Sequence, residues 1–157
     1  MLSAMFNLKA AEDTPSAGLG DEINVGGACY KYVQASAAID AFSLVRITST
    51  NTCAETTITD LTTTRPGLCG IPQFAFTSGQ YGWVPVGPFE IREDNVTTFK
   101  VLSKIASASV KLYGSATAGS VDDAVNNPPI DGLTLTAAQA VDDTATACIA
   151  TKRLTVN

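Results

Sequence analysis

The sequence contains no histidine, and this absence excludes several kinds of chemistry at once. A serine or cysteine nucleophile needs a base beside it, and in catalytic triads that base is an imidazole. The four cysteines (Cys29, Cys53, Cys69 and Cys148) follow no CxxC or zinc-ligand spacing. We therefore expect no metal site and no cofactor. Small buried thiols are the first interpretation of these cysteines, and a disulfide formed later in an oxidising environment is the alternative.

Clustered positive charge is also lacking. The ten Lys and Arg residues are scattered, and the net charge is −5. A nucleic-acid or anionic-membrane surface needs a basic patch, so neither partner is expected. No apolar run approaches the roughly 20 residues that a membrane-spanning helix requires. The first 15 residues have no continuous apolar segment of the signal-peptide kind, so synthesis and folding in a cytoplasm are expected.

The remaining reactive side chains form no convincing catalytic pattern. Two acidic pairs are present, Asp122-Asp123 and Asp142-Asp143. Adjacent residues on a strand point to opposite faces, so neither pair converges on one site, and both are interpreted as solvated turn residues. The glycines form no phosphate-binding loop, and no serine is placed against a lysine. We therefore expect that the chain is not an enzyme.

What the chain does contain is short apolar stretches with a period of two. Hydrophobic residues make up 45% of the chain and charged residues only 16%. Strands are predicted at 29–33, 42–48, 68–76, 80–91, 96–102, 109–113, 133–136, 146–150 and 153–156, with a further short strand near Thr57. This pattern predicts an all-β fold, a small barrel or sandwich of about eight short strands with little helix. Residues 1–25 are expected to form an extended or flexible arm, and residues 26–157 a single domain.

The stretch FAFTSGQYGWVPV, residues 74–86, is the most aromatic part of the chain. If Ser78-Gly79 forms a tight turn, Phe76 faces Tyr81 and Ala75 faces Gly82. The four aromatic side chains then share one face of the hairpin: Phe74, Phe76, Tyr81 and Trp83. The opposite face carries Ala75 and Gly82, whose small size favours close packing against another layer. These aromatic side chains either belong to the core or form a subunit contact, and the predicted hairpin register is compatible with both.

Several stretches resemble one family of proteins. They are the strand YKYVQASAAI, the segment GIPQFAFTSGQYGWVPV and the late turn AGSVDD, of which QYGWV is the most specific. In these features the chain resembles the capsid decoration (cement) proteins of tailed bacteriophages, over about residues 18–157. The residues that carry the resemblance are Tyr30, Tyr32, Val33, Gln34, Ala35, Gly70, Gln73, Gly79, Gln80, Tyr81, Gly82, Trp83, Val84, Val86, Gly119, Val121 and Asp122.

The resemblance implies a structural virion protein without catalytic residues. Proteins of this family are small β-rich domains, often homotrimers, on the outside of the mature capsid at three-fold or quasi-three-fold positions. They clamp neighbouring subunits of the major capsid protein, and in several groups an N-terminal arm lies along the shell. Synthesis would take place in the host cytoplasm. Candidate subunit or capsid contacts are Phe6, Leu8, Tyr81, Trp83 and Phe89.

Two other functions stay open on the sequence alone. The chain could be a different β-rich virion component, such as a tail-tube or head-fibre subunit, because such a protein would share the composition of a decoration protein. It could also be an enzyme or a carbohydrate-binding domain in which Tyr81 and Trp83 form a stacking platform.

Overall fold

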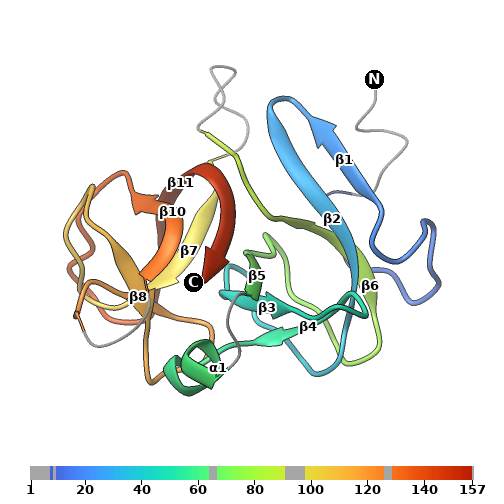
Figure 1. Cartoon of the computed structure of the whole chain (residues 1–157), viewed down its shortest axis with the longest axis horizontal. Coiled ribbons are helices and arrows are strands. Elements are labelled where there is room, and N and C mark those ends of the chain that lie inside the picture. Colours follow the sequence, from blue (N-terminus) through green and yellow to red (C-terminus); the bar gives the residue numbers. More distant parts are fainter. Residues whose placement is uncertain (1–7, 9, 64–66, 91–97, 126–128, 157) are drawn as a thin grey trace.

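The chain folds almost entirely into β-structure. The computed structural model describes residue 8 and residues 10–63, 67–90, 98–125 and 129–156. Strands account for 47% of the chain and helix for 4%. The predicted all-β class, with a barrel and little helix, is therefore confirmed (Figure 1).

A closed five-stranded barrel forms the C-terminal half of the described chain. Its strands are β7 (Lys100–Ser103), β8 (Leu112–Gly114), β9 (Val121–Asp122), β10 (Pro129–Leu135) and β11 (Thr144–Val156). Each strand is hydrogen-bonded to the next in the order β11-β10-β8-β9-β7, and pairing of β7 with β11 closes the ring. Strands β7 and β9 run parallel, whereas the other neighbours are antiparallel.

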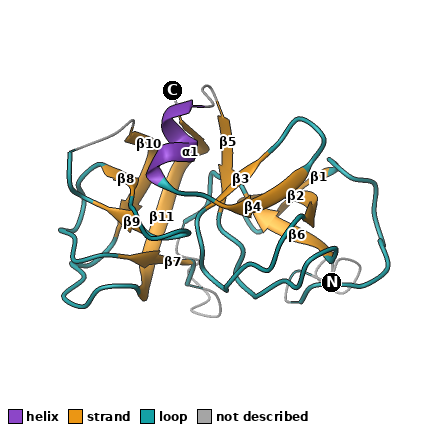
Figure 2. Cartoon of the chain, turned by 90° about the horizontal axis from the view of Figure 1, so that it is seen from below, coloured by secondary structure: helices purple, strands orange, loops and turns teal. Residues whose placement is uncertain are grey.

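The N-terminal half forms a second, nearly closed barrel. Its strands are β1 (Glu22–Val25), β2 (Ala28–Ala35), β3 (Val45–Ile47), β4 (Thr52–Glu55), β5 (Gly67–Gly70) and β6 (Tyr81–Pro85). The pairing order is β6-β2-β4-β3-β5, and β1 adds to the edge of β2. After β5, the Ile71 amide donates a hydrogen bond of 3.0 Å to the Pro85 carbonyl and brings the two ends together. Pairing of β5 with β11 joins the two halves, which lie side by side in Figure 2.

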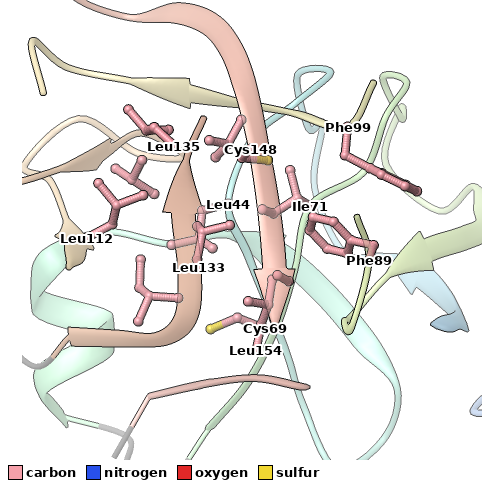
Figure 3. Close-up of a cluster of buried hydrophobic side chains, with 14 of the residues drawn as sticks. Leu44, Cys69, Ile71, Phe89, Phe99, Leu112, Leu133, Leu135, Cys148 and Leu154 are labelled. Carbon is pink, nitrogen blue, oxygen red and sulfur yellow. The ribbon is translucent and has the colours of Figure 1, made fainter. Parts of the chain in front are cut away.

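Two hydrophobic clusters occupy opposite faces of β2. Tyr30 and Tyr32 point into the larger cluster, which spans both halves and includes Leu133 and Leu154 of the C-terminal barrel (Figure 3). Val33 belongs to the smaller cluster inside the N-terminal half, together with Val45, Ile47 and Val84 from neighbouring strands. Because side chains alternate across a strand, burial on both faces makes β2 the wall between the two cores.

The segment between β3 and β5 differs from its prediction. The short strand predicted near Thr57 is β4, which covers Thr52–Glu55, and a short helix that was not predicted, α1, covers Ile58–Thr63. The helix begins with a capping box, because the Asp60 carboxylate accepts hydrogen bonds from the Thr57 amide (2.9 Å) and hydroxyl (2.8 Å). Local side-chain bonding therefore ends the extended conformation at Thr57.

Other strand boundaries also shift. The two final predicted strands are one continuous strand, β11, and the short strands β1 and β9 were not predicted. Strand β1 forms because Gly26 and Gly27 adopt positive φ values of 57° and 80° and turn the chain back onto β2. The last residues of the expected arm are therefore part of the sheet.

The rest of the described arm lies on the chain's own domain. Glu12 and Tyr81 exchange backbone hydrogen bonds of 2.8 Å in both directions. The Gln80 side-chain amide donates a 2.8 Å hydrogen bond to Asp13. Leu8 and Ala17 pack against the larger hydrophobic cluster. The described residues of the arm are thus held against the N-terminal half of the fold.

Candidate binding surface

The turn predicted in the aromatic stretch forms, but the predicted hairpin does not. The Gln80 amide donates to the Thr77 carbonyl at 3.2 Å, and Gly79 has a φ of 88°. Strand β6 then pairs with β2 instead of with residues 74–77. Phe76 exchanges backbone hydrogen bonds of 2.9 and 3.0 Å with Ile39. The predicted register is wrong because both sides of the turn bond to earlier segments of the chain.

The four aromatic side chains consequently divide between the two cores. Trp83 lies in the larger cluster, with its ring 5.0 Å from that of Tyr32. Phe74 and Phe76 pack with the smaller cluster, and a Cβ at Gly82 would lie 2.9 Å from the Phe76 ring and 3.3 Å from the Phe74 ring. Gly82 is therefore closely covered, but by these rings and not by another sheet. Ala75 is exposed and does not oppose it.

The predicted contact residues that the structure describes pack in or against the chain's own core. Trp83 is 1% exposed and Phe89 is fully buried, so neither side chain can contact a partner. Tyr81 is half-buried and stacks on Tyr32 at a centroid distance of 6.4 Å. Leu8 contacts the chain's own core, and Phe6 lies outside the described residues. A stacking platform for sugars on Trp83 is excluded for the same reason, because its ring is covered.

Other exposed apolar side chains lie on the loops at one end of the C-terminal barrel. Among the described residues, five large hydrophobic side chains are exposed, and four of them belong to the loops at this end: Ile105, Val110, Val125 and Val141. We call residues 104–111, 123–125 and 136–143 the distal loop surface. Val125 is 80% exposed, Val141 62% and Ile105 61%. Single exposed aliphatic residues are ordinary, whereas four on three adjoining loops form a candidate interaction site.

The barrel topology gathers these loops. Strands β7 and β9 are parallel, so the loops that follow them leave from the same end. Antiparallel pairing brings the start of β8, the end of β10 and the start of β11 to that end as well. Ala106 and Gln139 then exchange backbone hydrogen bonds of 3.1 and 2.8 Å across two of the loops. The surface is therefore built from segments far apart in the sequence.

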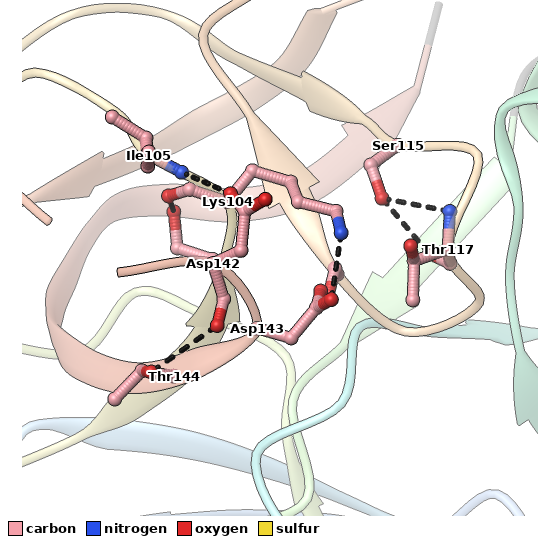
Figure 4. A network of polar contacts seen from close by, with 9 residues as sticks. Lys104, Ile105, Ser115, Thr117, Asp142, Asp143 and Thr144 are labelled. Carbon is pink, nitrogen blue, oxygen red and sulfur yellow. Dashed lines mark hydrogen bonds and ion pairs between the residues drawn. The ribbon is translucent and has the colours of Figure 1, made fainter. Parts of the chain in front are cut away.

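Carboxylates hold the distal loops in place (Figure 4). Asp142 accepts a 3.0 Å hydrogen bond from the Ile105 amide, and Asp123 accepts one of 2.8 Å from the Ser107 amide. Asp143 contacts both the Lys104 ammonium and the Ser120 hydroxyl at 2.6 Å. The acids within each pair thus bond different partners, and the loops are tied to one another.

The same network shifts two pKa values. The hydrogen bond from Lys104, followed by that from Ser120, lowers the pKa of Asp143. The Asp143 carboxylate in turn raises the pKa of Lys104. Both groups therefore stay ionised at neutral pH, and the apolar side chains of the distal loop surface stand beside fixed charges.

Sequence reasoning missed this surface. The residues concerned stand in the stretches KIASASVK, DDAVNN and TAAQAVDD, where isolated aliphatic side chains lie among Ala, Ser and acidic residues. An aliphatic residue inside a turn-like, polar stretch is the signal that could have indicated exposure. The three stretches lie up to about 40 positions apart in the chain, so only the fold reveals that they meet.

In the part of the chain that the structure describes, no group of three or more Cys, Asp or Glu side chains is arranged to hold a metal ion. No described helix is long and apolar enough to cross a bilayer. The four cysteines are unbridged thiols, and burial raises the pKa of Cys53, Cys69 and Cys148 to about 12.

The fold is all-β, with a closed five-stranded barrel joined to a second, nearly closed set of strands and with exposed aliphatic side chains on the loops at one end. No protein-family model, curated protein or solved structure matches the chain.

Proposed function

We propose that the chain is a structural virion protein that binds the outside of a mature phage capsid. It would stabilise the shell by clamping neighbouring subunits of the major capsid protein, as a homotrimer at three-fold or quasi-three-fold positions. The observation that carries a binding role is the distal loop surface, where four aliphatic side chains are left in water. The capsid as the partner rests on the resemblance of the QYGWV region to decoration proteins.

The exposed area is large enough to contribute to binding. Burying the exposed part of Val125, Val141 or Ile105 would stabilise a complex by about 1–2 kcal/mol each. Their loops are fixed in advance by the carboxylate network, so little conformational entropy is lost on docking. Exposed aliphatic side chains on loops that are fixed in advance suit a protein that is soluble alone and buries surface on assembly.

The charges around the distal loop surface favour a protein other than a second copy of this chain as its partner. Asp122, Asp123, Asp142 and Asp143 stand on or beside the distal loops, against Lys104 and Lys111. Two copies of this surface would therefore bring like charges together, which opposes self-association there. Within the proposal, the distal loop surface faces the major capsid protein, and the trimer contacts lie elsewhere on the molecule.

Decoration of stripped capsids tests the proposal directly. Purified chain is added to expanded capsids from which it has been removed, and bound copies are located by cryo-electron microscopy. Saturable density at three-fold or quasi-three-fold positions supports the proposal. Density along the tail, or at a fibre, would instead favour the alternative that the chain is another β-rich virion component. Absence of any binding to the particle would refute a virion role.

A further inference from the structure

The two halves of the fold share one strand order. In the N-terminal half the strands pair in the order β6-β2-β4-β3-β5, and in the C-terminal half in the order β11-β7-β9-β8-β10. Raising each strand number of the first series by five gives the second. The directions agree as well: β2 with β4 and β7 with β9 are parallel, whereas the other corresponding neighbours are antiparallel. Many orders are open to five strands, so this agreement requires an explanation.

The register between the strands agrees in the same way. Ala35 of β2 pairs with Cys53 of β4, and Ser103 of β7 pairs with Val121 of β9. Both members of the second pair stand the same number of positions after their counterparts in the first pair. Cys53 also lies opposite the last residue of β3, and Val121 lies opposite the last residue of β8. The corresponding strands are therefore aligned residue by residue.

A backbone bridge between two loops is repeated too. Ile39 lies in the loop after β2 and exchanges hydrogen bonds of 3.0 and 2.9 Å with Phe76, which lies between β5 and β6. Ala106 lies in the loop after β7 and exchanges hydrogen bonds of 3.1 and 2.8 Å with Gln139, which lies between β10 and β11. The loops that leave corresponding strands are thus tied together at the same place.

Left-handed backbone conformations also occur at corresponding places. Each half has a positive φ in the loop before its second strand, in the turn before its third strand and in the turn before its fifth strand. The pairs are Phe42 and Ser109 (69° and 59°), Asn51 and Gly119 (60° and 76°), and Gly79 and Asp143 (88° and 53°). All the described residues other than glycine that have a positive φ belong to this set. Residues with a side chain rarely adopt this conformation, so the agreement is specific.

From these agreements we infer that the chain is a tandem repeat of one five-stranded unit, with β2–β6 as the first copy and β7–β11 as the second. The backbone path is kept while the side chains have diverged; Tyr32 of the first unit, for example, corresponds to Lys100 of the second. Because the side chains differ, the repeat is evident in the fold and not in the hydrophobic pattern. Turns at corresponding places should be interchangeable.

The repeat also separates side chains that the unit needs from side chains that it does not need. Exposed Ile105 stands between β7 and the backbone bridge, where the first unit has Ala37-Ala38. Exposed Val141 stands in the turn before β11, where the first unit has Thr77-Ser78. Since the first unit forms the same bridge and turn without aliphatic side chains there, those of the second unit serve contact with a partner. Assignment of this contact to the capsid rests on the proposed function, whereas the repeat does not.

Exchange of one turn tests the repeat. The turn TSTNT, residues 48–52, is closed by a 2.9 Å hydrogen bond from the Thr48 amide to the Thr52 carbonyl. Its counterpart is SATAGS, residues 115–120, closed by a 3.1 Å hydrogen bond from the Ser115 amide to the Ser120 carbonyl. A chimera with SATAGS in place of residues 48–52 should melt within about 4 °C of the parent chain, because its glycine takes the left-handed position of Asn51.

The matched control carries GATASS at the same place, which is the same set of six residues with the glycine moved to the first position. A residue with a side chain then occupies the left-handed position, so this control should melt roughly 3 °C or more below the chimera. The exchange is made in this direction because a Cβ at Gly119 would lie 2.6 Å from the Ser43 hydroxyl. Failure of the SATAGS chimera to fold, or a melting temperature no higher than that of the control, would overturn the inference.

A second variant tests the contact role of the second unit. Ile105→Ala combined with Val141→Ser introduces the side chains of the first unit and should leave the melting temperature within about 4 °C of the parent chain. Binding to stripped, expanded capsids should weaken roughly tenfold or more, while Leu19→Ala, a change at another exposed aliphatic residue, should not affect it. A larger fall in melting temperature, or undiminished binding, would refute the contact role. Absence of binding by the parent chain would refute the proposed function and its capsid contact, and the turn exchange alone would still decide the repeat.

Discussion

Replacement of Gly82 by alanine tests the arrangement of the aromatic residues. A Cβ at this position would lie 2.9 and 3.0 Å from two ring atoms of Phe76, which is closer than real Cβ contacts allow. Phe76 is buried at 3% exposure and cannot swing into solvent without opening the smaller cluster. Overpacking of this kind costs about 1–3 kcal/mol. For a chain of this size the melting temperature should fall by roughly 2–12 °C.

A double-mutant cycle identifies the cause of the loss. Phe76→Leu removes ring atoms that the new methyl group meets, so the two changes together should cost less than the sum of the single changes. We expect a coupling of about 0.5–3 kcal/mol in the free energy of unfolding, from urea denaturation. Gly27→Ala is the control: its φ of 80° strains an alanine, but nothing lies within 4 Å of the new Cβ. It should show no coupling with Phe76→Leu.

The result that refutes this reasoning is additivity at Gly82. In the hairpin predicted from sequence, Gly82 opposes Ala75 and its face is turned away from Phe76. That geometry predicts no coupling between the two substitutions. A Gly82→Ala variant as stable as the parent chain, or one with purely additive losses, would therefore contradict the packing of the Phe76 ring on Gly82.

Three further predictions concern ionisation and burial. The hydrogen bond from Arg153, followed by that from Lys31, lowers the pKa of Glu22 to about 2. The carboxylate should then contribute stability above about pH 4.5 that is lost as the pH falls towards 2, and Glu22→Gln should abolish this part of the pH profile. Solvent screening keeps the contribution below about 1 kcal/mol. At pH 8 a thiol reagent should label Cys29, which is half-buried, before the three buried cysteines, whose labelling should require unfolding. The emission of Trp83 should be blue-shifted and resistant to iodide in the native chain, and equal quenching in native and unfolded protein would contradict its burial.

The sequence predicted those features of the fold that depend on local patterns. Alternation of Tyr30 and Tyr32 predicted a strand with both rings on one face, and both rings lie in the larger core. Gly79 predicted a turn that forms. Thr57 and Asp60 also stand at the spacing of a capping box, so the start of α1 could have been predicted from the sequence.

The strand that pairs with β6 could not be predicted from local sequence patterns. Trp83 could pair across the turn with Phe74 or with Tyr32 on strand β2, and both pairings bury aromatic surface. Strand β2 provides five consecutive partners for β6, whereas the segment before the turn bonds to Ile39. The better pairing involves residues about 50 positions apart, and local periodicity carries no information on such contacts.

The binding surface was missed for a related reason. Exposure of Ile105, Val125 and Val141 follows from where three loops end on a closed barrel. In the sequence these side chains stand singly in polar, turn-like stretches outside the predicted strands, and nothing in the local pattern shows that the three stretches meet. Conversely, Trp83 and Phe89 suggested contacts because large aromatics are common in interfaces, yet both fill the larger core. Composition alone does not distinguish an aromatic core from an aromatic interface.

Capsid binding by a distal-loop variant is the most direct test of the account. Val125→Asp combined with Val141→Asp alters two exposed side chains, so folding stability should change by less than about 1 kcal/mol. The matched control is Leu19→Asp, the same kind of change at an exposed aliphatic residue outside the distal loop surface. The double variant should bind stripped, expanded capsids roughly 30- to 1,000-fold more weakly, while Leu19→Asp binds as the parent chain does. Full decoration by the folded double variant, at the affinity of the parent chain, would contradict the central claim.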